Sequence, residues 1–357
     1  MPTLRAANSL EELSLLQAVA TDLSDRTTLS VYCDWLEDRD DPRGPFLREF
    51  LRAFDERRPL PTIPAAFSPA WAEVLGLPIR ARLRNGLDAR DPEMKVYLRR
   101  EYPQGFTAYE SRFDEILRSL RPAVRLVVGE TAPLETFPIG TTRVGGLPDL
   151  PIGMDWPQFP PTTAERDELA LIPFLLQIDL TEVRGTFADG ELPESGLLCL
   201  FQSRRCFHSD APAAVYYFPA GTPLRRYSLP SLKPASFDDE ALIDVAHPLT
   251  LADSLQVPYD LPRLGEDEPE ASYLVEGFYD QQESDHWFCT RYPKGQGYPW
   301  VAEGLEQRNL TGHLKLFQLK DNGHLHWYFG DGGRLHLYVP PEDARVGRFE
   351  SAFYYEV

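Results

Sequence analysis

Paired cysteines are missing from this sequence, which excludes the commonest cysteine-based sites. The 357 residues include four cysteines, Cys33, Cys199, Cys206 and Cys289, and no two of them form a Cys-x-x-Cys pair. Their scatter fits neither a disulfide framework nor a standard zinc motif, even with His208 close to Cys206. We therefore expect buried thiols and no bound metal.

Long apolar runs are missing as well. The longest, from Leu169 to Leu176, is interrupted by Pro173 and is far shorter than the roughly 18 residues that a membrane helix needs. The first twenty residues lack the basic start and unbroken apolar core of a secretion signal. The sequence therefore predicts a cytoplasmic protein that does not bind a membrane.

Motifs for nucleophilic catalysis and for nucleotide binding are also lacking. No Gly-x-Ser-x-Gly elbow is present, and no cysteine has the sequence surroundings of a nucleophile. The pair Gly145-Gly146 behind Arg143 is too short to surround a phosphate, and it predicts a turn or a close backbone approach instead. We expect no cofactor and assign no catalytic residue.

Charge of one sign dominates the second part of the chain. The formal net charge is -19; residues 1–125 carry 19 basic and 20 acidic groups, whereas residues 126–357 carry 17 and 35. Because an acidic surface repels phosphates, this excludes a general nucleic-acid binder. We expect an unknown protein or small ligand as partner, basic or neutral rather than anionic.

The composition is that of a folded chain, with 43% hydrophobic and 12% aromatic residues. Its 33 prolines argue against long helical repeats, because proline lacks the amide hydrogen that a helix interior needs. If residues 80–84 are extended, Arg80, Arg82 and Arg84 share one face. They could bind phosphate there, but we favour an exposed sheet edge protected by charge.

The front of the chain predicts helices. Ser9 and Glu12 have the spacing of a capping box, in which the glutamate reaches back to the first turn. A second helix is expected from Asp25 up to the turn at 39–44, and a third from Pro45 onward. We predict four segments: a helical domain at 1–58, a proline-rich connector at 59–69, a mixed or helical segment at 70–123, and a sheet domain at 124–357.

Residues 13–53 resemble the repeat-companion domain of bacterial proteins. The resemblance rests on three motifs: Leu15-Leu16-Gln17-Ala18, then Tyr32-Cys33-Asp34-Trp35-Leu36-Glu37 through Asp41-Pro42-Arg43, then Phe46-Leu47-Arg48. This family forms short N-terminal helical modules and implies no reaction.

From residue 124 the pattern changes to short β-branched and aromatic runs separated by turn residues, which predicts antiparallel strands. The fold class is therefore α+β, with a helical module followed by a mainly antiparallel, β-rich mixed domain. Two stretches share a glutamine between apolar residues and a second strand after it, 174–201 with Gln177 and 315–338 with Gln318. This similarity suggests an internal duplication.

The sheet domain resembles the YwqG-like family, a bacterial domain of unknown function, over residues 124–355. The matching motifs are Thr142-Arg143-Val144-Gly145-Gly146-Leu147-Pro148-Asp149-Leu150-Pro151, Trp156-Pro157, Leu175-Leu176-Gln177-Ile178-Asp179-Leu180, Leu192-Pro193-Glu194-Ser195-Gly196-Leu197-Leu198, and Gly330-Asp331-Gly332-Gly333-Arg334-Leu335-His336-Leu337. The resemblance implies a mixed, mainly antiparallel fold and supplies no substrate. Several relatives are encoded near toxin systems, which implies an interaction or immunity role.

One stretch predicts a hairpin with a polar face, in which residues 324–329 pair with residues 334–339 across an Asp331-Gly332-Gly333 loop. The candidate ligand-binding residues on and beside that face are His324, His326, Tyr328, Asp331, Arg334, His336 and Tyr338. They could bind an anion, or a metal through His326 and His336. The alternative is an ordinary outward sheet face, and we assign no metal site.

Two functions follow from these observations. The first is a non-enzymatic binding or protein-interaction module, with toxin immunity as a special case. The second is a hydrolase or other enzyme that uses the His/Tyr face around His326 and His336. We favour the first, because no motif in the sequence assembles a nucleophile, a base or a metal site.

Overall fold

The computed structural model divides the chain into two compact units. One comprises residues 1–124, 185–187 and 252–285, and the other comprises residues 125–184, 188–251 and 286–357. The structure describes residues 9–85, 100, 113–157, 174–201, 214–228, 245–256, 286–290, 312–320, 322, 325, 327 and 334–356.

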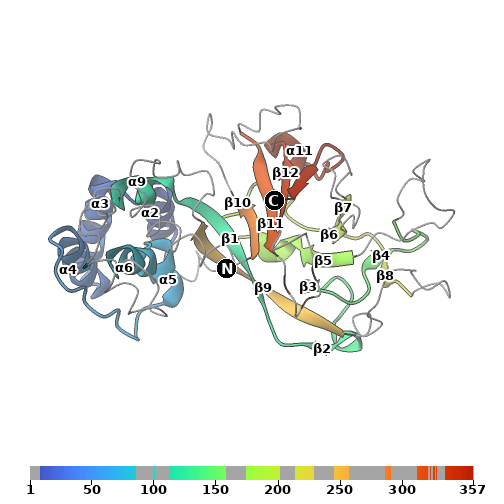
Figure 1. Cartoon of the computed structure of the whole chain (residues 1–357), viewed down its shortest axis with the longest axis horizontal. Coiled ribbons are helices and arrows are strands. Elements are labelled where there is room, and N and C mark those ends of the chain that lie inside the picture. Colours follow the sequence, from blue (N-terminus) through green and yellow to red (C-terminus); the bar gives the residue numbers. More distant parts are fainter. Residues whose placement is uncertain are drawn as a thin grey trace. The chain divides into compact units, whose positions relative to one another are not determined.

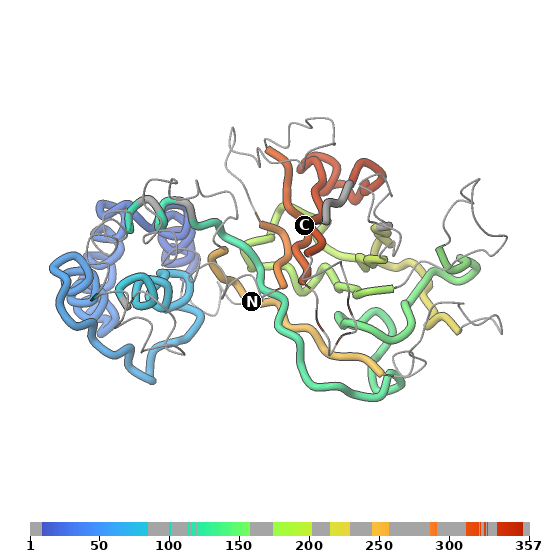
Figure 2. Tube along the Cα trace, in the orientation of Figure 1, coloured from blue at the N-terminus to red at the C-terminus, as the bar shows by residue number. Residues whose placement is uncertain are grey.

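The first unit is built from helices, drawn in blue to teal in Figures 1 and 2. Their bounds are α2 (Leu10–Thr21), α3 (Arg26–Glu37), α4 (Arg43–Asp55), α5 (Pro69–Val74), α6 (Leu77–Asn85) and α9 (Phe113–Ser119). The predicted starts near Ser9 and Asp25 are confirmed, because both side chains cap the helices that follow them. None of the described helices is long and apolar enough to cross a membrane.

Glu12 departs from the predicted capping box. Its backbone N–H donates to the Ser9 hydroxyl at 3.1 Å, but its carboxylate is fully buried. That carboxylate accepts from the Tyr32 hydroxyl at 2.7 Å and pairs with Arg43 at 2.8 Å, and the Trp71 indole donates to the same hydroxyl at 2.9 Å. The motif residues of α3 and α4 therefore fix the interior of the helical unit.

The proline-rich segment belongs to the same unit. Leu60, Ile63 and Phe67 pack against the helical core, and α5 and α6 follow. The expectation for Arg80, Arg82 and Arg84 is wrong: these residues lie in helix α6, and Arg80 is fully buried. Its guanidinium stacks over the Phe54 ring, 5.4 Å from the centroid, so the arginine run is no exposed sheet edge.

The second unit is β-rich, as predicted. The strand pairs whose register is described are antiparallel. The bounds of the strands are β1 (Arg121–Val128), β2 (Ala132–Pro133), β3 (Arg143–Val144), β4 (Asp149–Pro151), β5 (Phe174–Asp179), β6 (Leu197–Phe201), β7 (Ala214–Phe218), β8 (Leu224–Arg226), β9 (Val245–Gln256), β10 (His286–Thr290), β11 (Leu314–Lys320), β12 (Arg334–Val339) and β13 (Phe353–Glu356). Short helices η1 (Leu134–Thr136), η2 (Leu180–Val183) and α11 (Pro341–Arg345) connect them. The fold class is α+β.

The sheet order shows two similar halves. It runs β13-β12-β11-β10-β1-β9-β3-β5-β6-β7, so that two four-strand groups extend outward from β1 and β9, while β4 and β8 form a separate ribbon (Figure 1). We call β3-β5-β6-β7 the first repeat and β10-β11-β12-β13 the second. Gln177 lies opposite Cys199 in the first, and Gln318 lies opposite His336 in the second.

The two repeats also share their irregularities. Each has a register shift two residues before the glutamine, between Phe174 and Leu176 in β5 and between Lys315 and Phe317 in β11. A β-bulge changes the direction of the side chains around it, so a shared bulge is a specific structural feature. These observations support the internal duplication that the sequence suggested.

The predicted hairpin is wrong. Strand β12 pairs along its whole length with β11 and on its other edge with β13, so no edge remains for residues 324–329. Leu325 instead lies in a turn, and Trp327 makes an isolated bridge to Asn322. Nearness in sequence indicated the wrong partner for β12. The strand that pairs with it is β11, which lies earlier in the chain and contains Gln318.

Candidate functional site

Three of the seven predicted ligand-binding residues lie on β12, and two of these are buried. His336 is 2% exposed and Tyr338 is 3% exposed, while Arg334 is part-exposed. The two rings stack with centroids 6.5 Å apart and planes at 8°. The alternative of an ordinary outward face is therefore wrong at His336 and Tyr338. His324, His326, Tyr328 and Asp331 lie outside the described residues.

His336 is an unusual buried group, because its Nδ1 atom has no hydrogen-bond partner in the part of the chain that the structure describes. Burial lowers its pKa well below the ordinary value, and the positive charges of Lys315 and Arg334 lower it further. Lys315 is itself 1% exposed, and its ammonium donates to Gln318 Oε1 at 2.9 Å. His336 is therefore held neutral inside the second repeat.

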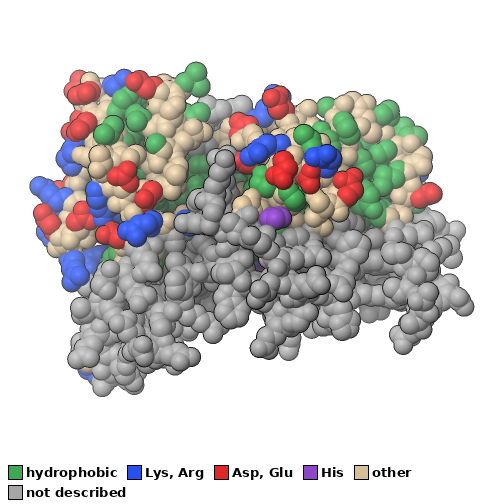
Figure 3. Space-filling model, turned by 90° about the horizontal axis from the view of Figure 1, so that it is seen from above, with side chains coloured by type: hydrophobic (Ala, Val, Ile, Leu, Met, Phe, Trp, Pro, Cys, Tyr) green, Lys and Arg blue, Asp and Glu red, His purple; other side chains and the backbone are tan. Residues whose placement is uncertain are grey.

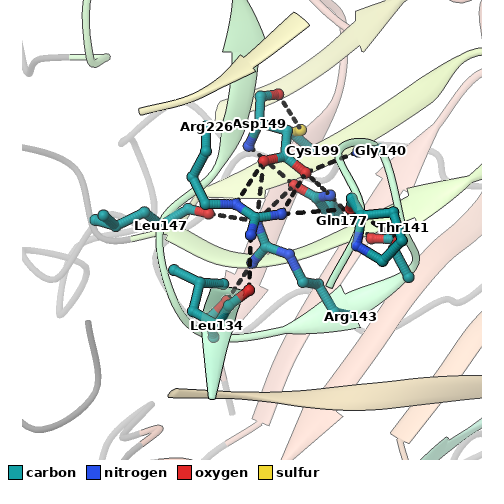
Figure 4. A network of polar contacts seen from close by, with 11 residues as sticks. Leu134, Gly140, Thr141, Arg143, Leu147, Asp149, Gln177, Cys199 and Arg226 are labelled. Carbon is teal, nitrogen blue, oxygen red and sulfur yellow. Dashed lines mark hydrogen bonds and ion pairs between the residues drawn. The ribbon is translucent and has the colours of Figure 1, made fainter. Parts of the chain in front are cut away.

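A second polar cluster, in the first repeat, was missed by sequence reasoning. Figure 4 shows Arg143, Asp149, Gln177 and Arg226 converging from strands β3, β4, β5 and β8. The first three are fully buried. We call these four residues the buried polar network.

Asp149 is the acceptor at the centre of this network. Its carboxylate accepts from the Gly140 N–H at 2.8 Å, from Gln177 Nε2 at 2.8 Å and from Arg226 Nε at 2.9 Å, and it lies 3.5 Å from Arg143 Nη2. Burial raises the pKa of this carboxyl, but the Arg226 hydrogen bond, the Arg143 charge and the other donors outweigh it, so the pKa lies below its ordinary value. Asp149 therefore stays ionised in the interior.

The two arginines connect this carboxylate to the backbone. Arg143 donates to the carbonyls of Gly145, at 2.5 Å, and Leu147, and Arg226 donates to the carbonyl of Leu134 at 2.7 Å (Figure 4). Burial lowers the pKa of Arg143 to about 10, which leaves it charged at neutral pH. The guanidinium groups therefore fasten the turns around β3 and β4.

Gln177 completes the network with both ends of one amide. Its Oε1 accepts from Asp149 N at 3.0 Å and from Arg143 Nη2 at 3.3 Å, while its Nε2 donates to Thr141 O at 2.9 Å. Beside it, Cys199 is a fully buried thiol whose pKa is raised by burial. Burial therefore disfavours the thiolate, which is the nucleophilic form of a cysteine.

The Gly145-Gly146 turn behaves as expected. Both residues have positive φ, +74° and +69°, and a Cβ at Gly146 would lie 2.6 Å from Leu134 Cδ1. Cys289, the residue of the second repeat equivalent to Gly145, also has positive φ, +54°. This turn is therefore a close backbone approach, the reading that needs no ligand.

Chemically, the buried polar network is suited to holding the fold. Its carboxylate is surrounded by donors and has no exposed surface, so it cannot act on a substrate from solvent. Within the described part of the chain, no group of three or more His, Cys, Asp and Glu side chains could hold a metal ion. Cys33, Cys199 and Cys289 are buried thiols outside any disulfide, as expected, whereas Cys206 and His208 lie outside the described residues.

The sequence contained signals for three of the four residues of this network. Arg143, Asp149 and Gln177 lie in the motifs quoted above, but the motifs do not show which residues meet in space. Arg226 lies in no recognised motif, and nothing in the sequence indicated its role.

Two comparisons with known proteins bear on these features. A search of curated proteins finds no match. A family model described as a domain of unknown function, DUF1963, matches residues 142–356. The matched segment begins one residue before β3 and ends with β13, so it includes both repeats and the buried polar network. The chain belongs to the DUF1963 family.

Proposed function

We propose that this chain is a non-enzymatic binding protein whose β-rich unit recognises a basic or neutral protein. The proposal is carried by one observation: the polar residues of the family motifs lie in the interior of the fold. Asp149, Arg143 and Gln177 are fully buried and bonded to one another and to backbone groups. They present no reactive group to a substrate, and His336, named for the enzymatic alternative, is buried as well.

The charge of the β-rich part supports a partner of this kind. Residues 126–357 carry 35 acidic and 17 basic groups. Glu130, Glu135 and Asp155 are exposed there. On the face drawn in Figure 3, acidic side chains lie among basic ones. Recognition of a partner would therefore depend on the positions of charges of both signs. Such charges mainly raise the association rate and add specificity.

The two family resemblances seen in the sequence form part of the same proposal. We infer that the β-rich unit is YwqG-like and that the helical unit is an accessory repeat-companion module. Toxin immunity is the special case in which the partner is a toxin.

Affinity capture tests the proposal. The full chain is immobilised and exposed to native lysate of its source cells, and bound proteins are identified by mass spectrometry at about 0.05 M and about 0.5 M salt, since high salt screens surface charges. A single dominant partner is then purified, and its Kd is measured against the wild-type chain and three variants.

Two variants, Glu130→Lys and Glu135→Lys, reverse exposed charges of the β-rich unit, and Asp38→Lys makes the same change on the helical unit. We expect one basic or neutral partner, released by salt, with weaker binding to one or both β-rich variants and unchanged binding to Asp38→Lys. Recovery of no partner above blank resin, or a partner indifferent to both β-rich variants and to salt, would contradict the proposal.

A further inference from the structure

A buried histidine at the start of β10 holds the residues that follow β11. His286 is 6% exposed, and its Nδ1 atom accepts a hydrogen bond from the backbone N–H of Lys320, the last residue of β11, at 3.3 Å. The other ring nitrogen, Nε2, lies 3.4 Å from the side-chain amide of Asn322. Because a backbone N–H can only donate, Nδ1 carries no hydrogen, and the ring is the neutral tautomer with its hydrogen on Nε2.

The residues after β11 bond to one another against this ring. Asn322 and Trp327 form an isolated bridge, in which each backbone N–H donates to the carbonyl of the other residue at 3.1 Å. The backbone N–H of Leu325 also donates to the Asn322 carbonyl at 3.1 Å. The Trp327 ring, whose residue is 6% exposed, meets the His286 ring with centroids 5.1 Å apart and planes at 68°. We call His286, Lys320, Asn322 and Trp327 the histidine clasp.

Protonation of the ring is incompatible with this geometry. A protonated imidazole carries a hydrogen on both nitrogens, so Nδ1 would point a donor at the Lys320 N–H instead of accepting from it. Burial lowers the pKa of His286 to about 4, and the charge of Lys320 contributes to this shift. Lys320 is the charged group that acts on the ring among the described residues, because the other members of the clasp, Asn322 and Trp327, are uncharged.

We propose that the histidine clasp is an acid-sensitive device, closed at neutral pH and opened by protonation of His286. Opening releases the backbone N–H of Lys320 and exposes the ring of Trp327. An exposed imidazole takes up its proton near pH 6.5, so the closed form loses stability as the pH falls below that value. The clasp is formed within this chain, and the proposal does not depend on a binding partner.

The size of the effect follows from the two pKa values of His286, about 4 in the closed clasp and about 6.5 in the open one. Between these values, each unit of pH changes the ratio of open to closed clasp by about tenfold. From pH 7.5 to pH 5.0 this ratio should therefore rise about 30-fold. Below about pH 4, His286 should add no further rise, because the closed form then takes up the proton as well.

Hydrogen exchange of the full chain, resolved to single amides, tests the clasp. The reporters are the backbone amides of Lys320, Leu325 and Trp327, which donate within the clasp or beside it. Exchange is expressed as a protection factor, which removes the intrinsic pH dependence of the exchange chemistry and leaves the opening equilibrium. We expect the wild-type protection of these amides to fall about 30-fold from pH 7.5 to pH 5.0.

Two histidine variants assign this fall to a residue. His286→Asn keeps an acceptor, because an amide oxygen takes the place of Nδ1, but it does not titrate, so the fall should be smaller by about 10-fold or more. His247→Asn is the matched control and should keep the wild-type fall: His247 is a half-buried histidine of β9 whose Nδ1 lies 3.1 Å from the Gly129 carbonyl oxygen. His336 is unchanged in both variants, so its own response to acid cancels in the comparison.

Each outcome decides. A fall in the wild type and in His247→Asn that is reduced in His286→Asn supports the clasp. Constant protection in the wild type, or an equal fall in His286→Asn, overturns it. If His286→Asn does not fold, NMR titration of the histidine rings in the wild-type chain takes its place. A His286 midpoint at least about one pH unit below 6.5 supports the proposal, and a midpoint closer to 6.5 or above it overturns the proposal.

Discussion

Replacing Asp149 by alanine should destabilise the β-rich unit severely. The carboxylate is fully buried and accepts from Gly140, Gln177 and Arg226, with Arg143 at 3.5 Å. Removing it leaves the fully buried Arg143 without its carboxylate. Breaking a buried ion pair in this way typically costs about 3–5 kcal/mol, out of a total stability of about 5–15 kcal/mol. The variant should therefore lose about a fifth or more of its free energy of unfolding.

Urea unfolding followed by circular dichroism measures this loss, and hydrogen exchange of peptides from residues 174–201 locates it in β5 and β6. Asp155→Ala is the matched control, because Asp155 lies on the same segment with its side chain exposed. We expect it to change stability by less than about 0.5 kcal/mol.

A double-mutant cycle with Arg143→Met isolates the ion pair. Because replacing both members of a buried pair by apolar groups is often close to neutral, the double variant should be more stable than the sum of the two single losses predicts. Strict additivity, or a loss below about 1 kcal/mol for Asp149→Ala, would refute the view that the pair holds this unit together.

The same ion pair gives stability a defined pH dependence. The pKa of Asp149 is lower in the folded chain than the unfolded value of about 3.9. Its contribution is therefore complete above that value and is lost as the pH falls through the folded pKa. The stability difference between wild type and Asp149→Ala should thus be constant near neutral pH and shrink below about pH 4.

Two further substitutions test the helical unit and a turn. Arg80→Met should leave the free energy of unfolding unchanged or raise it by about 1–4 kcal/mol. Arg80 is fully buried and donates to the Leu23 carbonyl, but its Nε and Nη1 atoms have no hydrogen-bond partner among the described residues. A loss above about 2 kcal/mol would show instead that its charge stabilises the unit. Gly196→Ala should lower the free energy of unfolding in urea by about 1–3 kcal/mol, since φ is +114° and a Cβ would lie 2.4 Å from the Phe218 carbonyl oxygen. Gly221→Ala is the control, at φ +84° with open space around it, and should cost clearly less. Equal losses in the two variants would contradict the steric explanation.

The sequence predicted those elements whose signals are local. Capping by Ser9 and Asp25 and the apolar periodicity of the front located the helices, and alternating apolar runs located β5, β6, β11 and β12. Pairing partners are not local. The stretch at 324–329 follows β11 directly and was paired with β12 for its nearness in sequence, whereas the strand in contact is β11 itself.

The candidate site was harder to predict because burial decides its chemistry. Arg80, Arg82 and Arg84 alternate as in a strand, but they also fit a helix, and only the helical register buries Arg80. His336 was predicted as a ligand-binding residue on an open face, but it is buried. Lys315, whose charge lowers the pKa of His336, comes from β11 and carried no signal of its own. Residues 149 and 226 lie 77 positions apart, so their meeting could not be derived from spacing.

The glutamine shared by the two repeats shows how one side chain can join groups of opposite charge inside a sheet. A side-chain amide carries an acceptor and a donor on one rigid plane, so it can face a cation with one end and a carboxylate with the other. Gln177 does both, for Arg143 and Asp149, and the chain thereby supplies its own anion. Gln318 accepts from Lys315 with its Oε1 in the same way. The duplication has therefore kept an amide that accepts from a cation, while the residue opposite the glutamine has changed from Cys199 to His336.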